Sequence, residues 1–519
     1  MNLSLLWHLK TSAFIATGIL SSTLSGPAGL LKKIEARLKI DGAERGAKIV
    51  RRVGKLFIPS ENAMLEAIEK GEYSTALQLY NDAGLLDRIR YRSSAARAKS
   101  MLGLLLEPPE KSLTPMSDFE PTVLALFTNS LPESHGGYAY RTQTVLEVWG
   151  SLDIPYTAYT RFGFPVVVGR YPKSREEIVR NVSYNRMIDW VSLKSPIRRI
   201  EQTTKHLVKA GVEGGHNLLF TTTDYQNALA VSRAAAQLKI PWIYEVRGEL
   251  ENTWASRRAS FGDERPEKSE HYRLAQLAET EAMKAAYKVV VLSEVSKRNI
   301  AERGVPISKI EVIPNAVRAC QVDTNQHSGN DLRAELQLDN RIVIGSVSSL
   351  VEYEGFDILI RSMEVLDDNV HLLLVGDGPF RSELDEIARE SPNHERIHIV
   401  GRQPNETISQ WYELFDVFVI PRLDRKVCRN VTPMKALEAQ LLGKAIVASE
   451  LEAIIEVTGG VGVYVPPGDP VELAKGIEVA IDNKERYGLL SAEWARTRTT
   501  NLMEKRYSSL FNLPSREDC

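Results

Sequence analysis

From Pro121 onward, short apolar runs alternate with longer stretches in which apolar residues recur at helical spacing. Uninterrupted apolar runs are typical of parallel strands buried on both faces, and the stretches between them, such as 228–238 and 274–286, would form the covering helices. The runs predict strands at residues 122–127, 218–220, 242–246, 289–292, 310–313, 342–347, 370–375, 397–400, 417–420, 445–448 and 461–465. The pattern indicates an α/β chain with parallel sheets.

The strand–helix alternation is interrupted once, by a polar stretch at residues 314–341, and then restarts. We therefore predict two Rossmann-like, doubly wound domains, at residues 116–320 and 321–485, that face each other across a cleft. Ligands of open α/β sheets bind outside the carboxyl ends of the strands, so the cleft is the expected binding site. Residues 486–519 have a helical pattern and are expected to pack back on the first of these domains.

The first 115 residues have a different pattern, which predicts a helical extension. Residues 62–106 carry apolar residues at helical spacing on both sides of a turn near Gly71. Residues 11–31 contain no charge, and residues 32–55 contain nine basic and three acidic residues. Three interpretations of residues 11–55 stay open: a membrane span, an interfacial anchor on an anionic membrane surface, and a helix packed on the protein.

The overall charge and the cysteines narrow the class of protein. The formal net charge is −2, which gives no reason to expect a nucleic acid as partner. The three cysteines, Cys320, Cys428 and Cys519, are far apart and form neither a disulfide framework nor a zinc-ligand spacing. We therefore expect a cytoplasmic protein, either free or on the inner face of the cytoplasmic membrane.

Two glycine-containing loops follow predicted strands. Gly136 and Gly137 lie between a strand and a helix, where the backbone N–H groups at the start of a helix could bind a diphosphate. Gly376 and Gly378 also lie between a strand and a helix and permit a tight loop beside a ligand. Ordinary strand-to-helix turns would explain both pairs of glycines as well.

Three charged residues follow the predicted strand 417–420. Arg422 follows it after Pro421, and Lys435 and Glu438 share one face near the start of the next predicted helix. A lysine could neutralise a phosphate, and a carboxylate could accept hydrogen bonds from ribose hydroxyls. A solvated surface pair is the alternative for Lys435 and Glu438.

Taken together, these stretches resemble the family-4 (GT4-like) retaining glycosyltransferases of the GT-B fold, over residues 122–485. The resemblance rests on residues 130–138, 159–165, 244–248, 291–293, 313–315, 353–355, 375–379, 416–422, 437–439, 443–449 and 465–469. It implies transfer of a sugar from a nucleotide-sugar donor, UDP-linked rather than GDP-linked, with retention at the anomeric carbon and without a metal or another cofactor. It also implies that Glu438 binds the donor ribose, that Gly137 approaches the diphosphate and that Gly376 lines the donor pocket.

The chain departs from the family pattern at several positions. Ser349 and Glu354 stand where many members have an arginine and a lysine facing the diphosphate, and Asn430 replaces a carboxylate eight positions before Glu438. A histidine common after the third strand is replaced by Phe220 or by one of the threonines at 221–223. We hypothesise that Arg422 and Lys435 supply the positive charge that Ser349 and Glu354 cannot.

Three more polar residues lie near predicted strand ends of the first domain. Glu245 and Arg247 end a strand, and Arg141 lies one turn into the helix after Gly137. They are candidates for contacts with the acceptor or the donor sugar, and a structural ion pair is the alternative.

The leading interpretation is a glycosyltransferase of cell-envelope polysaccharide or glycoconjugate synthesis, acting on a glycan, glycolipid or lipid-linked acceptor. A non-catalytic GT-B scaffold or regulatory subunit is the alternative that the departures motivate. A sugar-nucleotide epimerase of the same fold is a third. Incubation with UDP- and GDP-sugars would separate them, because transfer, inertness and donor isomerisation are different outcomes.

Overall fold

The structure, a computed structural model, describes residues 3–24, 49, 63–115, 120–193, 195–259, 261–317, 332–404 and 407–513. By its contacts the chain divides into two compact units. The first unit comprises residues 1–246 and 250–289, and the second comprises residues 247–249 and 290–519. By contacts alone this division comes before the predicted boundary at residue 320, whereas the strands at residues 288–291 and 310–312 still belong to the first sheet. The boundary at residue 320 stays a prediction.

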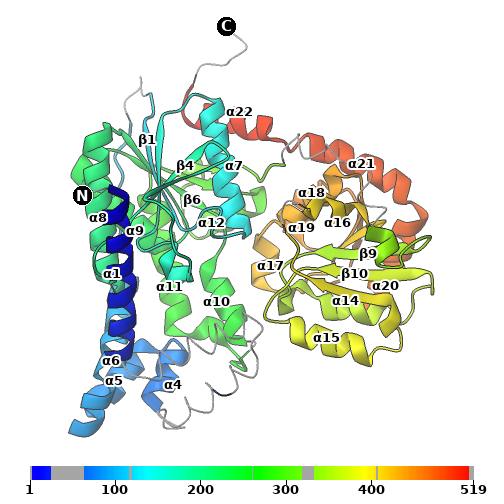
Figure 1. The fold of residues 1–519 in the computed structure, drawn as a ribbon, viewed down its shortest axis with the longest axis horizontal. Coiled ribbons are helices and arrows are strands. Elements are labelled where there is room, and N and C mark those ends of the chain that lie inside the picture. The colour runs from blue at the N-terminus through cyan, green and yellow to red at the C-terminus, as the bar shows by residue number, and fades with distance from the viewer. Residues whose placement is uncertain are drawn as a thin grey trace. The chain divides into compact units, whose positions relative to one another are not determined.

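An eight-stranded sheet has the strand order β3-β4-β2-β1-β5-β6-β7-β8 (Figure 1). Its strands are β1 (Val123–Phe127), β2 (Tyr156–Thr160), β3 (Glu176–Val179), β4 (Val182–Arg186), β5 (Leu218–Thr222), β6 (Trp242–Val246), β7 (Lys288–Val291) and β8 (Ile310–Val312). The pairs β4–β2, β2–β1, β1–β5 and β5–β6 are parallel, and β3 is antiparallel to β4. From β1 the chain first adds β2, β4 and β3 on one side and then β5 to β8 on the other, so the topological switch point lies between β1 and β5.

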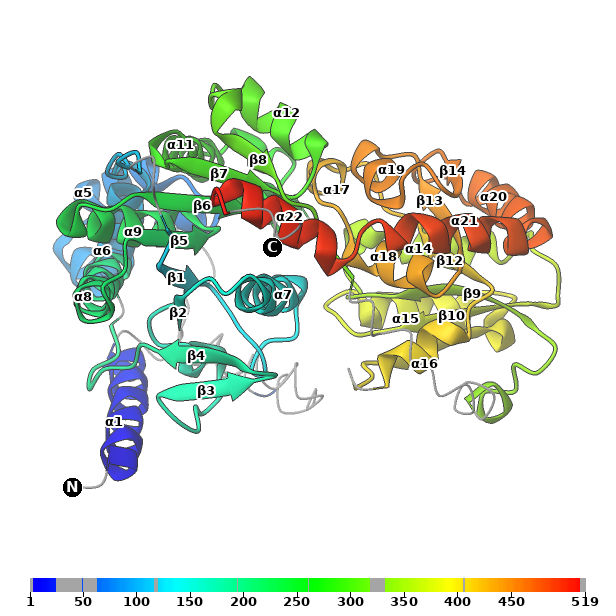
Figure 2. The ribbon, with the colours of Figure 1, turned by 90° about the horizontal axis from the view of Figure 1, so that it is seen from above.

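Helices cover both faces of this sheet. Figures 1 and 2 show α8 and α9 on one face of the central strands and α7 on the other. The helices after β1 are α7 (Gly137–Ser151), α8 (Pro196–Gly214), α9 (Tyr225–Leu238), α10 (Leu250–Ala259), α11 (Glu270–Ala285) and α12 (Glu294–Glu302), with short 3-10 turns η1 (Val166–Val168), η2 (Pro266–Lys268) and η3 (Ile307–Lys309). Every residue of β1, β5 and β6 is buried, as expected for strands between two helical layers.

A six-stranded parallel sheet has the strand order β11-β10-β9-β12-β13-β14. Its strands are β9 (Ile342–Val347), β10 (Val370–Val375), β11 (Ile397–Gly401), β12 (Val417–Ile420), β13 (Ala445–Ser449) and β14 (Val463–Val465). The chain fills one side of β9 first and then returns to the other side with β12. This reversal defines a topological switch point between β9 and β12, and it is the place where Rossmann-like sheets bind nucleotides.

Alternate residues of these strands enter two separate cores. Leu373, Val375 and Phe418 point into a core formed with α16, α18 and α19, whereas Leu372 and Leu374 point into a core formed with α14, α15 and α20. The elements are η5 (Glu352–Glu354), α14 (Phe356–Ser362), α15 (Arg381–Glu390), η6 (His394–Arg396), α16 (Ile408–Glu413), α17 (Lys426–Asn430), α18 (Met434–Leu441), α19 (Glu452–Thr458), α20 (Pro470–Asp482), α21 (Lys484–Arg496) and α22 (Thr500–Leu510). The two Rossmann-like sheets predicted from the sequence are confirmed.

All eleven strands predicted from the apolar runs are present, and β2, β3 and β4 are additional. The helix α21 packs on α18 and β13 of the second unit, so for residues 486–496 the expected packing on the first Rossmann-like domain is not what these contacts show. For the rest of residues 486–519 that packing stays a prediction. The reason is local fit: the backbone of Gly488 lies against Gly443, and the Trp494 ring covers Gly459.

The amino-terminal extension is helical, as predicted, and consists of α1 (Leu3–Leu24), α4 (Ala63–Glu69), α5 (Tyr73–Asp82) and α6 (Leu85–Leu105). In α1, Phe14 is buried, Lys10 pairs with Asp189 at 3.2 Å, and the Thr17 hydroxyl accepts a hydrogen bond from the Ser192 N–H at 2.9 Å. This part of α1 is therefore a helix packed on the protein. Among the described residues, no helix has the length and apolar character that a membrane crossing needs. The basic segment 32–55 lies outside the described residues, apart from Ile49.

Candidate functional site

The switch point of the second sheet brings together the loop after β9 and the loop after β12. The β9 loop ends in η5 with Glu354, and Arg422 stands two residues after β12. Gly355 lets the two loops touch, because a Cβ atom on it would lie 2.0 Å from the Pro421 carbonyl oxygen. The topology thus places Glu354 beside Arg422, although 68 positions separate them in the sequence.

Glu354 is the centre of a buried ion cluster. The Arg422 guanidinium contacts both of its carboxylate oxygens, at 2.9 and 3.3 Å, and also donates to the Val431 carbonyl at 2.9 Å. The Lys435 ammonium donates to Glu354 and, at 2.6 Å, to the Ser348 hydroxyl. The three charged side chains are between 7% and 11% exposed, and two cations share one anion. The cluster therefore carries a net charge of about +1, given the ordinary ionisation of its members.

The protonation states follow from this arrangement. Burial raises the pKa of Glu354, but Arg422 and Lys435 outweigh that effect and hold the pKa at about 2. Burial, with repulsion from Arg422, lowers the pKa of Lys435 to about 8 against the attraction of Glu354. At neutral pH all three groups are charged. The arrangement corrects our hypothesis in one respect: Glu354, interpreted as the place of a missing cation, binds both cations that were expected to compensate for it.

Glu438 lies one turn after Lys435 on α18. Its Oε2 accepts a 2.7 Å hydrogen bond from the Tyr412 hydroxyl, and burial raises its pKa although Tyr412 opposes the shift. Arg422 and Lys435 are thus in contact with one anion, and Glu438 is held separately on the same helix as Lys435. The alternative of a solvated surface pair for Lys435 and Glu438 is wrong, because neither residue is exposed.

Gly376 and Gly378 are explained by backbone packing. Gly376 has φ +147°, and a Cβ atom there would lie 1.7 Å from the Ser348 carbonyl oxygen. A Cβ atom on Gly378 would lie 2.1 Å from the Leu350 carbonyl oxygen. The loop after β10 therefore lies directly on the loop after β9, beside the serine that Lys435 contacts. Their predicted contact with a donor stays a prediction.

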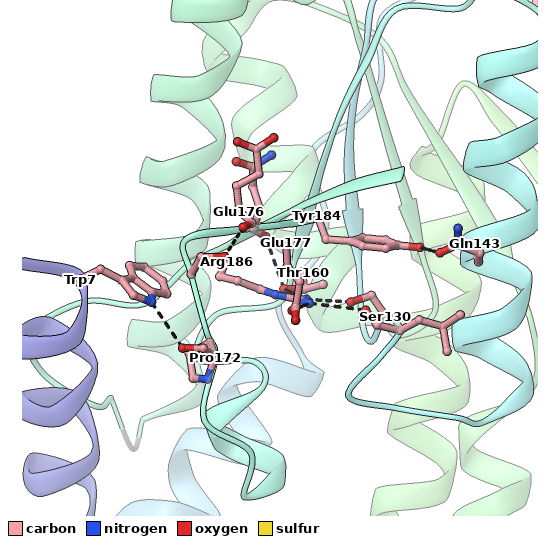
Figure 3. Close-up of polar contacts among 12 residues, drawn as sticks. Trp7, Ser130, Gln143, Thr160, Pro172, Glu176, Glu177, Tyr184 and Arg186 are labelled. Carbon is pink, nitrogen blue, oxygen red and sulfur yellow. Dashed lines mark hydrogen bonds and ion pairs between the residues drawn. The ribbon is translucent and has the colours of Figure 1, made fainter. Parts of the chain in front are cut away.

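Gly136 and Gly137 form the start of α7 in the first unit, as N-cap and first helical residue. A Cβ atom on either would meet no atom within 4 Å, so protein packing does not explain these two glycines. The preceding loop is anchored by Arg186, which donates to the Ser130 hydroxyl at 2.7 Å and pairs with Glu177 at 2.6 Å (Figure 3). Because Arg186 is 2% exposed, this anchor is part of the core.

Arg141 and Glu245 form a buried ion pair in the first unit. The Nε and Nη2 atoms of Arg141 lie 2.9 and 2.7 Å from Glu245 Oε1, and the two side chains are 2% and 0% exposed. The pair joins α7 to the end of β6, so Glu245 does take part in a structural ion pair, with Arg141 as a partner. Arg247, two residues further on, is also buried. Contacts of these residues with an acceptor or donor sugar stay a prediction.

Asn430, which replaces a family carboxylate, has structural partners. Its amide donates to Glu249 at 2.9 Å and accepts from the Asn299 amide at 2.7 Å. Sequence reasoning missed Tyr412, Ser348 and the pairing role of Glu354. Ser348 directly follows an apolar strand, which is a usable signal, whereas Tyr412 carries none. In the described part of the chain, no group of three or more His, Cys, Asp or Glu side chains is arranged to bind a metal ion. The expectation of a metal-free reaction stays a prediction.

Two family models match the chain in the order of its two sheets. A glycosyl transferase 4-like domain matches residues 157–316, and a glycosyl transferases group 1 domain matches residues 341–483. Together they cover more than half of the 519 residues.

Known proteins share sequence or fold with this chain. The lipopolysaccharide core biosynthesis glycosyltransferase LpsD of Rhizobium meliloti is 30% identical over 206 residues, which are 39% of this chain and 56% of LpsD. The 2-deoxystreptamine glucosyltransferase of Streptomyces kanamyceticus is 24% identical over 40% of this chain and 55% of its own length. The matched part thus spans about half the length of these curated relatives. HepE of Anabaena has been solved in complex with UDP and with UDP-glucose. Its UDP complex superposes on this chain with a TM-score of 0.59 at 17% sequence identity, and the match covers 75% of this chain and 99% of HepE.

The fold, the two matched domain models and their order along the chain agree with the resemblance found in the sequence. The chain belongs to the GT4-like, group 1 glycosyltransferases of the GT-B fold.

Proposed function

We propose that this protein is a retaining glycosyltransferase that moves a sugar from a UDP-sugar to a glycan, glycolipid or lipid-linked acceptor of the cell envelope. Family membership supports the reaction class. The name of the relative LpsD refers to lipopolysaccharide core synthesis, and HepE was solved with UDP and UDP-glucose. The acceptor class and the base of the donor are inferred from these proteins.

The observation that carries the proposal is the net positive cluster at the switch point of the second sheet. Breaking the bond between the sugar and UDP leaves negative charge on the diphosphate, and a fixed cation in a buried setting lowers the barrier to that step. An ammonium group has three N–H donors, and Ser348 and Glu354 take two of those of Lys435. The ammonium also lies 5.7 Å from the centre of the Phe356 ring, and we expect its third N–H to turn to a phosphate oxygen when the donor binds.

The other residues have supporting roles. Arg422 is held by Glu354 and by the Val431 carbonyl. It would therefore keep the cluster in place and add its positive charge to the electrostatic potential at the diphosphate. Glu438, one turn beyond Lys435, would accept hydrogen bonds from the ribose hydroxyls through the carboxylate that Tyr412 orients. Gly137 would let the diphosphate approach the N–H groups at the start of α7.

The test measures release of UDP or GDP from UDP-glucose, UDP-galactose, UDP-N-acetylglucosamine and GDP-mannose. Each donor is tested with and without acceptors from a lipid extract. We expect turnover with a UDP-sugar, and an axial-to-axial or equatorial-to-equatorial outcome at the anomeric carbon by NMR of the product. Lys435→Ala should reduce kcat by about 100-fold or more, the usual loss when a charge-stabilising donor is removed. Lys475→Ala is the matched control, because Lys475 is an exposed lysine on α20.

A folded Lys435→Ala protein with wild-type turnover would refute the assignment of Lys435. Inertness of the wild type towards all donors and acceptors would favour the scaffold alternative, which the presence of Glu354 and Asn430 at family positions motivates. Isomerisation of the donor without transfer would favour the epimerase.

A further inference from the structure

The end of α6 that follows α5 has an unusual surface for a helix of a water-facing extension. Leu85, Leu86 and Ile89 are 75%, 82% and 67% exposed, so three large aliphatic side chains stand together on the first turns of α6. Figure 1 shows α4, α5 and α6 gathered at one end of the first unit, away from the strands. This segment lies outside both matched family domains and is a feature of this chain's own extension.

The first turns of α6 present large aliphatic side chains, and basic side chains lie on both flanks of that surface. Leu85, Ile89 and Ala96 lie along one line of the helix at spacings of four and seven, and all three are exposed. Arg90 and Arg97 lie on one side of this line, and Arg92 and Lys99 lie on the other. The opposite face is the buried one and carries Tyr91, Ala95 and Ala98. Exposed aliphatic side chains next to arginines combine the two contributions, apolar burial and attraction to anionic lipids, by which protein segments bind a bilayer interface.

The charge of this surface is mainly basic, and the described residues do not neutralise it. α6 contains five basic residues and one acidic residue, Asp87. Arg90, Arg92, Arg97 and Lys99 are exposed and form no ion pair with any residue of the described ranges. Arg88 instead fixes the turn, since its Nε donates to the Ala83 carbonyl at 2.9 Å while its own carbonyl accepts from the Tyr80 hydroxyl. The turn thus presents the apolar and basic side chains on a fixed support.

We propose that this face of α6, which we define as Leu85, Leu86, Ile89, Arg90 and Arg92, docks on a lipid surface rich in anionic head groups. The aliphatic side chains would enter the head-group boundary, and the flanking arginines would contact the phosphates. A nucleic acid would match the arginines but would leave the three aliphatic side chains in water. The proposal concerns location and does not depend on the proposed sugar transfer.

The full-length protein is sedimented with vesicles of equimolar phosphatidylcholine and phosphatidylglycerol, and with vesicles of phosphatidylcholine alone. We expect binding to the anionic vesicles that weakens as the salt concentration rises, because Debye screening reduces the attraction. Leu86→Ser/Ile89→Ser and Arg90→Gln/Arg92→Gln should each reduce vesicle binding roughly tenfold, since each removes one of the two contributions. Light scattering of the unbound protein is measured alongside.

Leu489→Ser and Arg496→Gln on α21 are the matched controls, because Leu489 is 75% exposed and Arg496 is also exposed. Both controls should bind anionic vesicles like the wild type. Equal binding to both vesicle types, or undiminished binding by both α6 variants, would overturn the proposal and point to another segment of the chain. A dimer that Leu86→Ser/Ile89→Ser dissociates would also overturn it, because the face would then be covered by a second copy. Donor turnover without vesicles should be the same in all variants, which separates this test from that of the sugar transfer.

Discussion

Lys435 illustrates how a single residue gains its properties from partners far away in the sequence. Its ammonium is buried beside a second cation, Arg422, and Glu354 offsets much of their repulsion. A lysine in such a setting gives up its proton more readily than one in water. The residue is therefore charged at neutral pH but loses its charge in a range that is accessible to kinetic measurement.

The pH dependence of kcat/KM tests this property. The pKa of Lys435 is lowered to about 8, so the free enzyme carries the charged lysine below that pH and loses it above. If the charge stabilises the leaving diphosphate, kcat/KM should be nearly constant up to about pH 7, be halved near pH 8 and fall about tenfold per pH unit above that. Lys435→Arg should move the fall to higher pH, since arginine keeps its proton. A profile that stays flat to pH 10 in the wild type would contradict the role of Lys435.

The sequence was sufficient to identify individual candidate residues of the site, but not the residues that pair with them. Arg422, Lys435 and Glu438 could be singled out because strand ends and helix starts are readable from local patterns. Glu354 could not be recognised as their counter-ion, because its pairing depends on the return of the chain from β11 to β12. Tyr412 lies on α16 in an ordinary apolar pattern, so nothing in the sequence marked it as the partner of Glu438.

Among the elements, the loop after β10 and the start of α7 both contain two glycines, yet for different reasons. Gly378 has its neighbour's backbone where a Cβ atom would lie, and Gly137 has open space there. Gly378→Ala should therefore lower the thermal stability of the protein, and Gly137→Ala should not, which differential scanning calorimetry can measure. If the diphosphate approaches α7, Gly137→Ala should nevertheless raise KM for the donor about tenfold or more, because the methyl group occupies the ligand's place. An unchanged KM would mean that no ligand comes close to Gly137.

The elements that the sequence predicted and those that it missed differ in burial. β9, β10 and β12 lie inside a sheet with helices on both faces, so nearly every position is apolar and the run is visible. β2, β3 and β4 contain alternating buried and accessible residues with many polar side chains, as in Tyr156–Thr160. β3 is the edge strand of its sheet and pairs antiparallel with β4. A search for uninterrupted apolar runs misses such strands.

At the scale of the whole molecule, a nucleotide that binds to one of the two sheets should stabilise the unit with that sheet more than the other unit. If UDP binds at the switch point of the second sheet, it should raise the melting temperature of the unit that contains Lys435 and Glu438. The gain is about 2.7 kcal/mol at a UDP concentration of 100 times Kd. Glu438→Gln should reduce the shift, since an amide accepts fewer hydrogen bonds from ribose than a carboxylate. Differential scanning fluorimetry with UDP, and with GDP as control, measures the shift in melting temperature. Equal shifts with UDP in the wild type and in Glu438→Gln would contradict the role of Glu438.

The packing of α21 bears on where a functional piece of this chain could be cut. The matched group 1 domain ends at residue 483, just before Lys484 begins α21. Yet α21 lies against α18, which carries Lys435 and Glu438, and its Gly488 and Trp494 fit against Gly443 and Gly459. A fragment trimmed to the family boundary would expose the outer side of α18 to water and loosen the support of both residues. Grafting or dissecting the nucleotide-type half therefore requires the chain to be kept at least through Arg496.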